Sequence, residues 1–218
     1  DENATIGDIE REMNYSGGTI SSLTINYRNS KQIASLASEF YVGLPTGIPS
    51  PPSRSGPLPP SLISYSNDAA EIEAIAAFAL QNSDLTIGVI LQTDHLRNNV
   101  YNALNSSLSS STLRVQTYHS KMSNDELASV EIEATGAITV ICGASCKGLE
   151  FDAVFIPRLE TYSLSPGQET EFKMNLYVRI SRARDYLFLS FCSQNEDKPE
   201  ILEYFPNDLV SHCKRVDK

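Results

Sequence analysis

The sequence predicts an α/β fold with a mainly parallel sheet and helices on both of its faces. Two observations lead to this prediction. Apolar segments of strand length alternate with amphipathic segments of helix length along most of the chain, and several strand segments are apolar at every position. Strands that alternate with helices are joined by right-handed crossovers, which make neighbouring strands parallel. Helices on both faces then bury both sides of each strand.

The first strand and helix precede a proline-rich segment. We expect a buried strand at residues 23–27 (LTINY), followed by a helix that Ser30 caps. The apolar face of that helix carries Ile33, Leu36, Ala37, Phe40 and Tyr41. Seven of the eleven prolines lie within residues 44–60. Because proline is excluded from helix interiors and central strands, this segment is expected to be a surface excursion.

The strand and helix pattern resumes after the prolines. A strand at 61–65 precedes a capped helix from about Asn67, whose apolar stripe carries Ile72, Ile75, Ala76, Ala79 and Leu80. Further strands are expected at 85–91, 113–118, 137–142, 152–157 and 186–191. Further helices are expected at 94–104, 124–131 and 169–182. We interpret residues 1–218 as one domain.

Composition and charge restrict the classes of function. The net charge of −10 argues against a free-standing nucleic-acid binder, although a strand held in a cleft shared with another domain remains compatible with it. No apolar run approaches the ~20 residues of a membrane helix, and the acidic start differs from a signal peptide, so we expect a cytoplasmic protein without a membrane partner. The four cysteines form no CxxC pair and the three histidines add no ligand spacing, which predicts buried reduced thiols and no metal site.

In parallel sheets, ligands bind outside the carboxyl ends of strands, so residues that follow strands are the first candidates for chemistry. The segment NYRNS (26–30) brings together Tyr27, which could stack on a base, and Arg28, which could grip a phosphate. An exposed tyrosine beside a solvated arginine is the alternative. In the segment 145–152, Gly148 permits positive φ or close backbone approach, and Glu150 could accept hydrogen bonds from sugar hydroxyls. An ordinary turn with charged residues in water would look the same.

A third segment, 177–185, contains three arginines within six residues: Arg179, Arg182 and Arg184. An arginine directed at a transferring phosphate stabilises the charge of the transition state. The alternative is a basic helix end, which the helix dipole also favours.

The order and spacing of the three segments resemble the second RecA-like domain of superfamily 1 helicases of the UvrD type. NYRNS resembles motif IV of that family, SCKGLEFDAVFI motif V, and LYVRISRARDYLFL motif VI. Asp1–Ala4 resembles the D-E-N-Q core of motif III, at the junction of the two motor domains. The resemblance therefore implies a RecA-like three-layer fold and a first domain, ahead of Asp1, that carries the Walker A loop. The chain itself has no Gly-Lys pair for such a loop.

The resemblance also implies roles for individual residues. Tyr27 would stack on the adenine of ATP, and Arg28 would reach its γ-phosphate. Glu150 would bind the ribose, Gly148 would shape the turn, and Lys147 is a further nucleotide-binding candidate.

In motif VI, Arg182 would be the arginine finger that acts on the γ-phosphate, and Arg179 is a further candidate. The implied cofactor is ATP with Mg²⁺, whose ligands would lie in the first domain. The implied partners are that first RecA-like domain and single-stranded DNA.

Two positions depart from the family pattern. Ala4 stands where motif III has a glutamine, and Ala144 stands where motif V commonly has a histidine. For nucleic acid we propose Tyr118, His119 and Ser145 as candidate contacts. Structural hydrogen bonds at the end of the sheet are the alternative role for Tyr118 and His119.

The resulting hypothesis is that the chain is the second motor domain of an ATP-dependent DNA helicase or translocase, inactive by itself. The interval between Arg28 and Lys147 leaves no room for the accessory domain that UvrD-type enzymes often insert there. The first alternative is a retired motor domain that acts as a protein-interaction module. The second, an unrelated α/β enzyme, lacks support because GxSxG, GxGxxG and metal-ligand patterns are missing.

Overall fold

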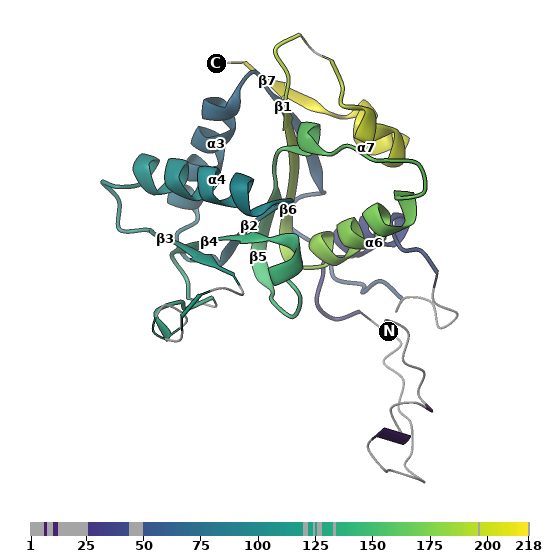
Figure 1. Ribbon diagram of the computed structural model, residues 1–218, viewed down its shortest axis with the longest axis horizontal. Helices are drawn as coiled ribbons and strands as arrows, with labels where there is room; N and C mark the ends of the chain where they lie inside the picture. Colours follow the sequence, from purple (N-terminus) through teal and green to yellow (C-terminus); the bar gives the residue numbers. More distant parts are fainter. Residues whose placement is uncertain are drawn as a thin grey trace.

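The computed structural model describes residues 7, 11–12, 26–43, 50–119, 122–123, 125, 128–132, 134–195 and 197–217. Within these residues a seven-stranded sheet is covered by helices on both faces (Figure 1). The predicted α/β, RecA-like three-layer architecture is confirmed. None of the described helices is long and apolar enough to cross a membrane.

Every pair of neighbouring strands in the sheet is parallel, as predicted. The strands are β1 (Ser61–Tyr65), β2 (Ile87–Leu91), β3 (Arg114–Tyr118), β4 (Ala137–Cys142), β5 (Phe151–Ile156), β6 (Ala183–Cys192) and β7 (Lys214–Val216). Their order across the sheet is β3-β4-β2-β5-β6-β1-β7. All seven amino ends therefore lie on one side, here called the amino end of the sheet, and all carboxyl ends lie on the other.

The helices divide between the two faces. They are α2 (Lys31–Glu39), α3 (Asp68–Gln81), α4 (Asp94–Ser107), α6 (Glu169–Ile180) and α7 (Asn207–Ser211), with short 3₁₀ turns at Gly143–Ser145, Leu159–Thr161 and Glu200–Tyr204. One core cluster packs α2 and α6 against the sheet, and a second packs α3 and α4 against the opposite face. Two faces thus bury the central strands, and every residue of β2 and β4 is buried.

The close packing of β2 against β5 depends on a glycine. A Cβ atom at Gly88 would lie 2.4 Å from the ring of Phe151, which is fully buried. Such overlap forces side chains or backbone to move, at a typical cost of about 1–3 kcal/mol. The apolar run at residues 85–91 therefore contains a glycine because the neighbouring aromatic ring fills its place.

Helix starts follow the predicted caps with one difference. Asn67 caps α3, and its Oδ1 accepts a hydrogen bond from the Ala70 amide at 3.0 Å. Ser30 occupies the predicted cap position of α2, but its side chain accepts no capping hydrogen bond. Its Oγ lies beside Gly56, where a Cβ atom would approach to 2.8 Å. The proline-rich segment thus packs against the Ser30 hydroxyl.

Several boundaries differ from the sequence-based expectation. Asn26 and Tyr27 are not in a strand, whereas residues 23–25 lie outside the described part. Leu80 was expected on the apolar stripe of α3 but is 53% exposed, because it is rotated away from the face on which its neighbour Ala79 is fully buried. β6 begins at Ala183 rather than at 186, and α6 ends at Ile180.

Other expectations fall on the chain termini or outside the description. α7 and β7, which are five and three residues long, were not predicted. The motif III residues 1–4 lie outside the described residues. Of the helix expected at 124–131, residues 124, 126 and 127 are not described, Asp125 and Ala128 are helical, and residues 129–131 are not helical. All four cysteines are free thiols, but only Cys142 and Cys146 are buried, while Cys192 and Cys213 are partly exposed.

Candidate functional site at the amino end of the sheet

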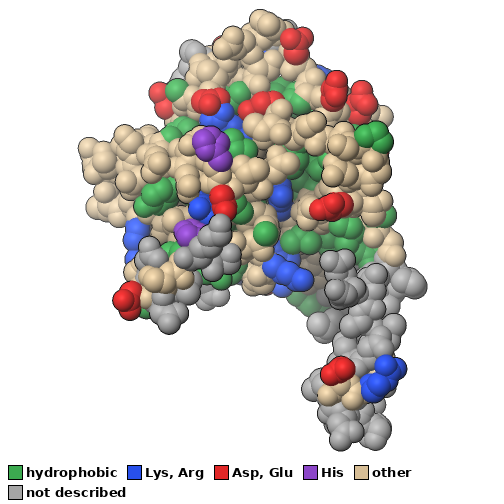
Figure 2. All heavy atoms as spheres, in the orientation of Figure 1, with side chains coloured by type: hydrophobic (Ala, Val, Ile, Leu, Met, Phe, Trp, Pro, Cys, Tyr) green, Lys and Arg blue, Asp and Glu red, His purple; other side chains and the backbone are tan. Residues whose placement is uncertain are grey.

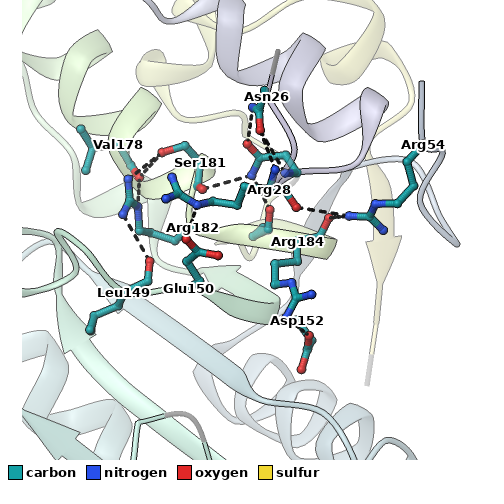
Figure 3. A network of polar contacts seen from close by, with 12 residues as sticks. Asn26, Arg28, Arg54, Leu149, Glu150, Asp152, Val178, Ser181, Arg182 and Arg184 are labelled. Carbon is teal, nitrogen blue, oxygen red and sulfur yellow. Dashed lines mark hydrogen bonds and ion pairs between the residues drawn. The ribbon is translucent and has the colours of Figure 1, made fainter. Parts of the chain in front are cut away.

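The candidate residues of the three segments meet at the amino end of the sheet. Glu150 directly precedes β5, and Arg182 directly precedes β6. Arg28 lies beside both of them (Figure 3). The expectation that the chemistry follows strands at their carboxyl ends is therefore wrong for these residues. The loop after β4 runs back across the sheet before β5 begins, and it carries Glu150 to the opposite end.

Arg182 is held by the protein itself. Arg182 is only 8% exposed, and its Nε donates a hydrogen bond to the Val178 carbonyl at 2.9 Å. Nη1 donates to the Leu149 carbonyl at 3.2 Å and Nη2 to the Ser181 hydroxyl at 3.1 Å. Burial lowers the pKa of the guanidinium, which still remains charged at neutral pH. The contact with Leu149 ties motif VI to motif V, and the three contacts together fix the orientation of the predicted finger.

Arg28 and Glu150 form an exposed ion pair. The Nε of Arg28 contacts Oε1 of Glu150, and the two side chains are 40% and 41% exposed. Tyr27, next in the chain, is 76% exposed, which makes it the most exposed of the large apolar residues in the described part. The predicted ribose ligand and the predicted phosphate ligand thus neutralise each other at the surface, beside a ring that is open to solvent.

Asn29 anchors the loop that carries Arg28, and the sequence analysis missed it. Asn29 is 1% exposed, and its Nδ2 donates hydrogen bonds to the carbonyls of Ser181 at 3.0 Å and Ala183 at 2.5 Å. Its Oδ1 accepts from Asn26 Nδ2 at 2.7 Å. The loop is therefore fixed to the segment on either side of Arg182. The position next to Tyr27 and Arg28 was the only signal in the sequence.

A cavity of about 520 Å³ opens beside Glu150. Its lining includes Gly148, Glu150, Asp152 and Arg184. Gly148 has φ of +89°, so the positive φ that the sequence suggested is present. Asp152 accepts hydrogen bonds from the amide and hydroxyl of Thr86 at 2.9 and 2.8 Å and lies 3.5 Å from Arg184 Nη1. Asp152 is thus engaged in structure, while Glu150 and the Gly148 backbone face the cavity.

Arg179 and Lys147 do not join this cluster. Arg179 is 7% exposed, contacts the Tyr162 hydroxyl, and lies 5.5 Å from the centre of that ring. A Cβ atom at Gly143 would lie 2.3 Å from its Nε, so Arg179 fills the space over the turn that follows β4. Lys147 is exposed on the loop between β4 and Gly148. Arg179 is therefore packed as a structural residue.

The candidate nucleic-acid residues lie at the other end of the sheet. Tyr118 ends β3 and packs partly against the core, His119 follows it, and Ser145 lies in the turn after β4. The His119 amide donates to Met122 Sδ at 3.4 Å, a contact of the backbone that does not involve the His119 ring. Among the described residues on the face shown in Figure 2, acidic and basic side chains are interspersed rather than gathered into a broad basic patch.

A second arginine and carboxylate cluster lies at the carboxyl end, where β1, β5 and β6 finish. Glu71 is 0% exposed, and its Oε2 lies 2.8 Å from Arg158 Nε, while its Oε1 accepts from Ser190 at 2.6 Å. Burial raises the pKa of Glu71 to about 7, against the lowering effects of Ser190 and Arg158. Arg158 also contacts Asp68 and lies 3.9 Å from Glu160.

This carboxyl-end cluster includes the one group of described residues with metal-like spacing. Asp68, Glu160 and Cys192 place ligand atoms within 4.8 Å of one another. The guanidinium of Arg158 already lies between the two carboxylates. Since that side chain supplies positive charge to both, we interpret the group as an internal ion-pair cluster.

Comparison with known proteins identifies the family. Residues 90–194 match the family model of the UvrD-like helicase C-terminal domain. This segment belongs to that family. The match includes the motif V and motif VI residues of the UvrD-like domain, whereas Tyr27 and Arg28 precede it. Arg28 joins the site through its contact with Glu150, and Tyr27 is its neighbour in the chain. No curated protein matches the sequence significantly.

Solved structures share the fold of the UvrD-like domain. The C-terminal domain of a possible DNA helicase from Lactobacillus plantarum WCFS1 is 20% identical with a TM-score of 0.58, over 87% of this chain and 98% of that one. Domain 2 of the DEAD-box helicase Mss116p, bound to an RNA duplex, is 15% identical with a TM-score of 0.51, over 72% of this chain and 63% of that one. At these identities the likeness establishes the fold alone.

Proposed function

We propose that this chain is the second motor domain of an ATP-dependent DNA helicase or translocase. The amino end of its sheet would close on ATP held by a first RecA-like domain. The observation that carries the proposal is the meeting of Arg28, Glu150 and Arg182 from three separate segments. Family membership of residues 90–194 supports it. The first domain would supply the Walker A loop and the ligands of Mg²⁺.

The residues present fit a nucleotide. Arg28 and Arg182 offer guanidinium groups suited to phosphate oxygens. Tyr27 offers an exposed ring for a base, and Glu150 can accept hydrogen bonds from ribose hydroxyls. Bound ATP with Mg²⁺ would supply the γ-phosphate that is transferred to water.

Arg28 and Glu150 must separate before they act on different parts of a nucleotide. An exposed ion pair contributes only about 0.2–1 kcal/mol, so a ligand that offers each side chain a new partner can displace it. Arg182 starts from a different state. Its three internal hydrogen bonds hold the guanidinium in place and reduce the entropy lost when a phosphate approaches.

Strand movement would follow from closing and opening of the two motor domains. Closure on ATP draws Arg28 and Arg182 to the phosphates, and hydrolysis releases them. The isolated chain has half of such a site, so we expect it to bind nucleotide weakly and to show negligible ATPase activity. Tyr118, His119 and Ser145 are the proposed contacts for single-stranded DNA.

The test is ATPase activity stimulated by single-stranded DNA, measured in the protein with its first motor domain. We expect Arg182→Ala to lower the stimulated rate by about 1000-fold, which is the lower end of the effect typical of an arginine finger. Arg182→Lys tests charge without the fork geometry, and Arg114→Ala removes an exposed, ion-paired arginine at the far edge of the sheet as the control. Circular dichroism establishes that each variant is folded.

Two outcomes would contradict the proposal. One is a wild-type protein without stimulated hydrolysis, and the other is a folded Arg182→Ala variant that hydrolyses ATP normally. Either result would favour the alternative of a retired motor domain that acts as an interaction module.

A further inference from the structure

One residue of the proline-rich segment, Arg54, contacts both the loop that carries Arg28 and the start of β6 (Figure 3). Its Nη1 pairs with Asp185, in the motif VI segment. Its Nη2 donates to the Arg184 carbonyl at 3.1 Å and to the Arg28 carbonyl at 3.3 Å. The guanidinium of Arg54 therefore bridges Arg28, the proposed phosphate contact, and the start of β6, which follows Arg182 directly.

The backbone of the segment is fixed along the loop that it bridges. Ser50 accepts a hydrogen bond from the Asn26 amide at 2.9 Å, and Arg54 accepts one from the Lys31 amide at 2.7 Å. The Gly56 amide donates to Gln32 Oε1 at 3.0 Å. Prolines at nearby positions restrict φ and reduce the number of conformations available to the segment. Arg54 is thus presented to the site from a backbone with little freedom.

We propose that Arg54 is a positioning residue of the nucleotide site. By joining the Arg28 carbonyl to the Arg184 carbonyl and Asp185, it sets where Arg28 lies relative to Arg182. This inference rests on the proposed function. It also gives the proline-rich segment a role, because the excursion predicted from composition is the element that carries this contact.

The geometry of the two arginines is expected to be sensitive to this contact. A misplacement of about 1 Å can lower a rate by about 100-fold when the displaced group must meet a transferring phosphate. Asn29 and the hydrogen bond from the Ser30 amide to the Arg184 carbonyl, at 2.8 Å, hold the loop near the same place. Loss of Arg54 should therefore loosen Arg28 without detaching the loop.

The experiment compares Arg54→Ala, Arg54→Lys and the control Arg114→Ala in the protein with its first motor domain. We expect Arg54→Ala to lower kcat/KM for ATP by about 10- to 100-fold, with Arg54→Lys intermediate because one ammonium cannot reproduce the forked contacts. The Kd for single-stranded DNA and the Tm should stay close to wild type. In the chain 1–218, amide exchange at Lys31 should become faster in Arg54→Ala.

The outcomes separate this inference from the proposed function. An active wild type whose Arg54→Ala variant keeps kcat/KM within twofold would overturn the positioning role alone. A wild type without strand-stimulated hydrolysis would overturn the proposed function and the positioning role with it. The inference would also be overturned if Arg54→Ala weakened DNA binding by the same factor as it lowered kcat/KM and also clearly lowered the Tm. Arg54 would then act on folding in general.

Discussion

Arginine and carboxylate side chains meet at both ends of the sheet, but they are shielded from water at only one. At the carboxyl end, Glu71 is fully buried and the side chain of Arg158 is 11% exposed. At the amino end, Arg28 and Glu150 are about two-fifths exposed. A buried charge without its partner is strongly destabilising, whereas an exposed pair exchanges its partners for water or ligand at small cost. The two pairs thus consist of the same chemical groups, but only the pair at the amino end of the sheet can readily exchange its partners for a ligand.

The largest expected effect is removal of Arg158. At pH 8, where Glu71 is mostly ionised, Arg158→Ala leaves this carboxylate buried without its cation, which should lower the free energy of unfolding by about 3–5 kcal/mol. Arg158 also has φ of +65°, a conformation that alanine adopts no more easily. Urea unfolding of the chain measures the effect. Arg158→Lys, which keeps the charge, should lose less, and Arg28→Ala should lose at most about 1 kcal/mol. Equal losses for the two alanine variants would contradict the comparison.

The second expected effect is a dependence of stability on pH that comes from Glu71. Its pKa is raised to about 7 in the folded protein, chiefly by burial, above the ordinary value of 4.5. The folded state therefore binds this proton more tightly than the unfolded state does. The stabilisation is complete below pH 4.5 and is lost as pH rises through 7, by about 3 kcal/mol at 1.36 kcal/mol per pKa unit.

Urea midpoints between pH 4.5 and 8 test this effect. Glu71→Gln removes the ionisable group and should flatten the curve over that interval. Glu150→Gln at the exposed pair is the matched control and should leave the slope as in wild type. An unchanged slope in Glu71→Gln would show that other groups cause the dependence.

The third effect concerns ligand rather than stability. Arg28→Ala should raise the KM for ATP by about 10-fold, equivalent to about 1.4 kcal/mol, because it removes one phosphate contact of several. Arg158→Lys should leave KM unchanged, since Arg158 lies at the opposite end of the sheet. Steady-state ATPase measurements in the protein with its first motor domain distinguish the two. A KM change for Arg158→Lys and none for Arg28→Ala would reverse our assignment of the site.

Local sequence pattern was sufficient for most of the fold. The strands at 61–65 and 137–142 lie where they were predicted. At 137–142 this is because burial of both faces is encoded in consecutive apolar residues. The three motif segments were also found, from their residue types next to strands and from their resemblance to the motifs of the family. Their meeting place was not, because the path of the loop between β4 and β5 depends on contacts with residues far away in the sequence.

Residues that act through long-range contacts were the ones that sequence analysis missed. Arg54 contacts Asp185, 131 positions away, and composition alone made its segment look like a solvent-exposed excursion. Glu71 offered a signal that was not used: it lies one helical turn before Ile75, on the apolar face of α3. A charged residue on an apolar stripe predicts a buried partner. It does not tell which of the 17 lysines and arginines that partner is.

The smallest effect bears most directly on ligand binding. In a double-mutant cycle with Arg28→Ala and Glu150→Ala, the coupling energy for unfolding should be below about 1 kcal/mol and should fall as salt rises from 0.05 to 0.5 M, as expected for an exposed pair. A coupling energy above about 2 kcal/mol that does not change with salt concentration would mean that the pair is shielded from water and ions. ATP would then have to break a contact as firm as that of Glu71 and Arg158, and the amino end would be a structural cluster. A weak, screened coupling leaves Arg28 and Glu150 free to exchange each other for phosphate and ribose.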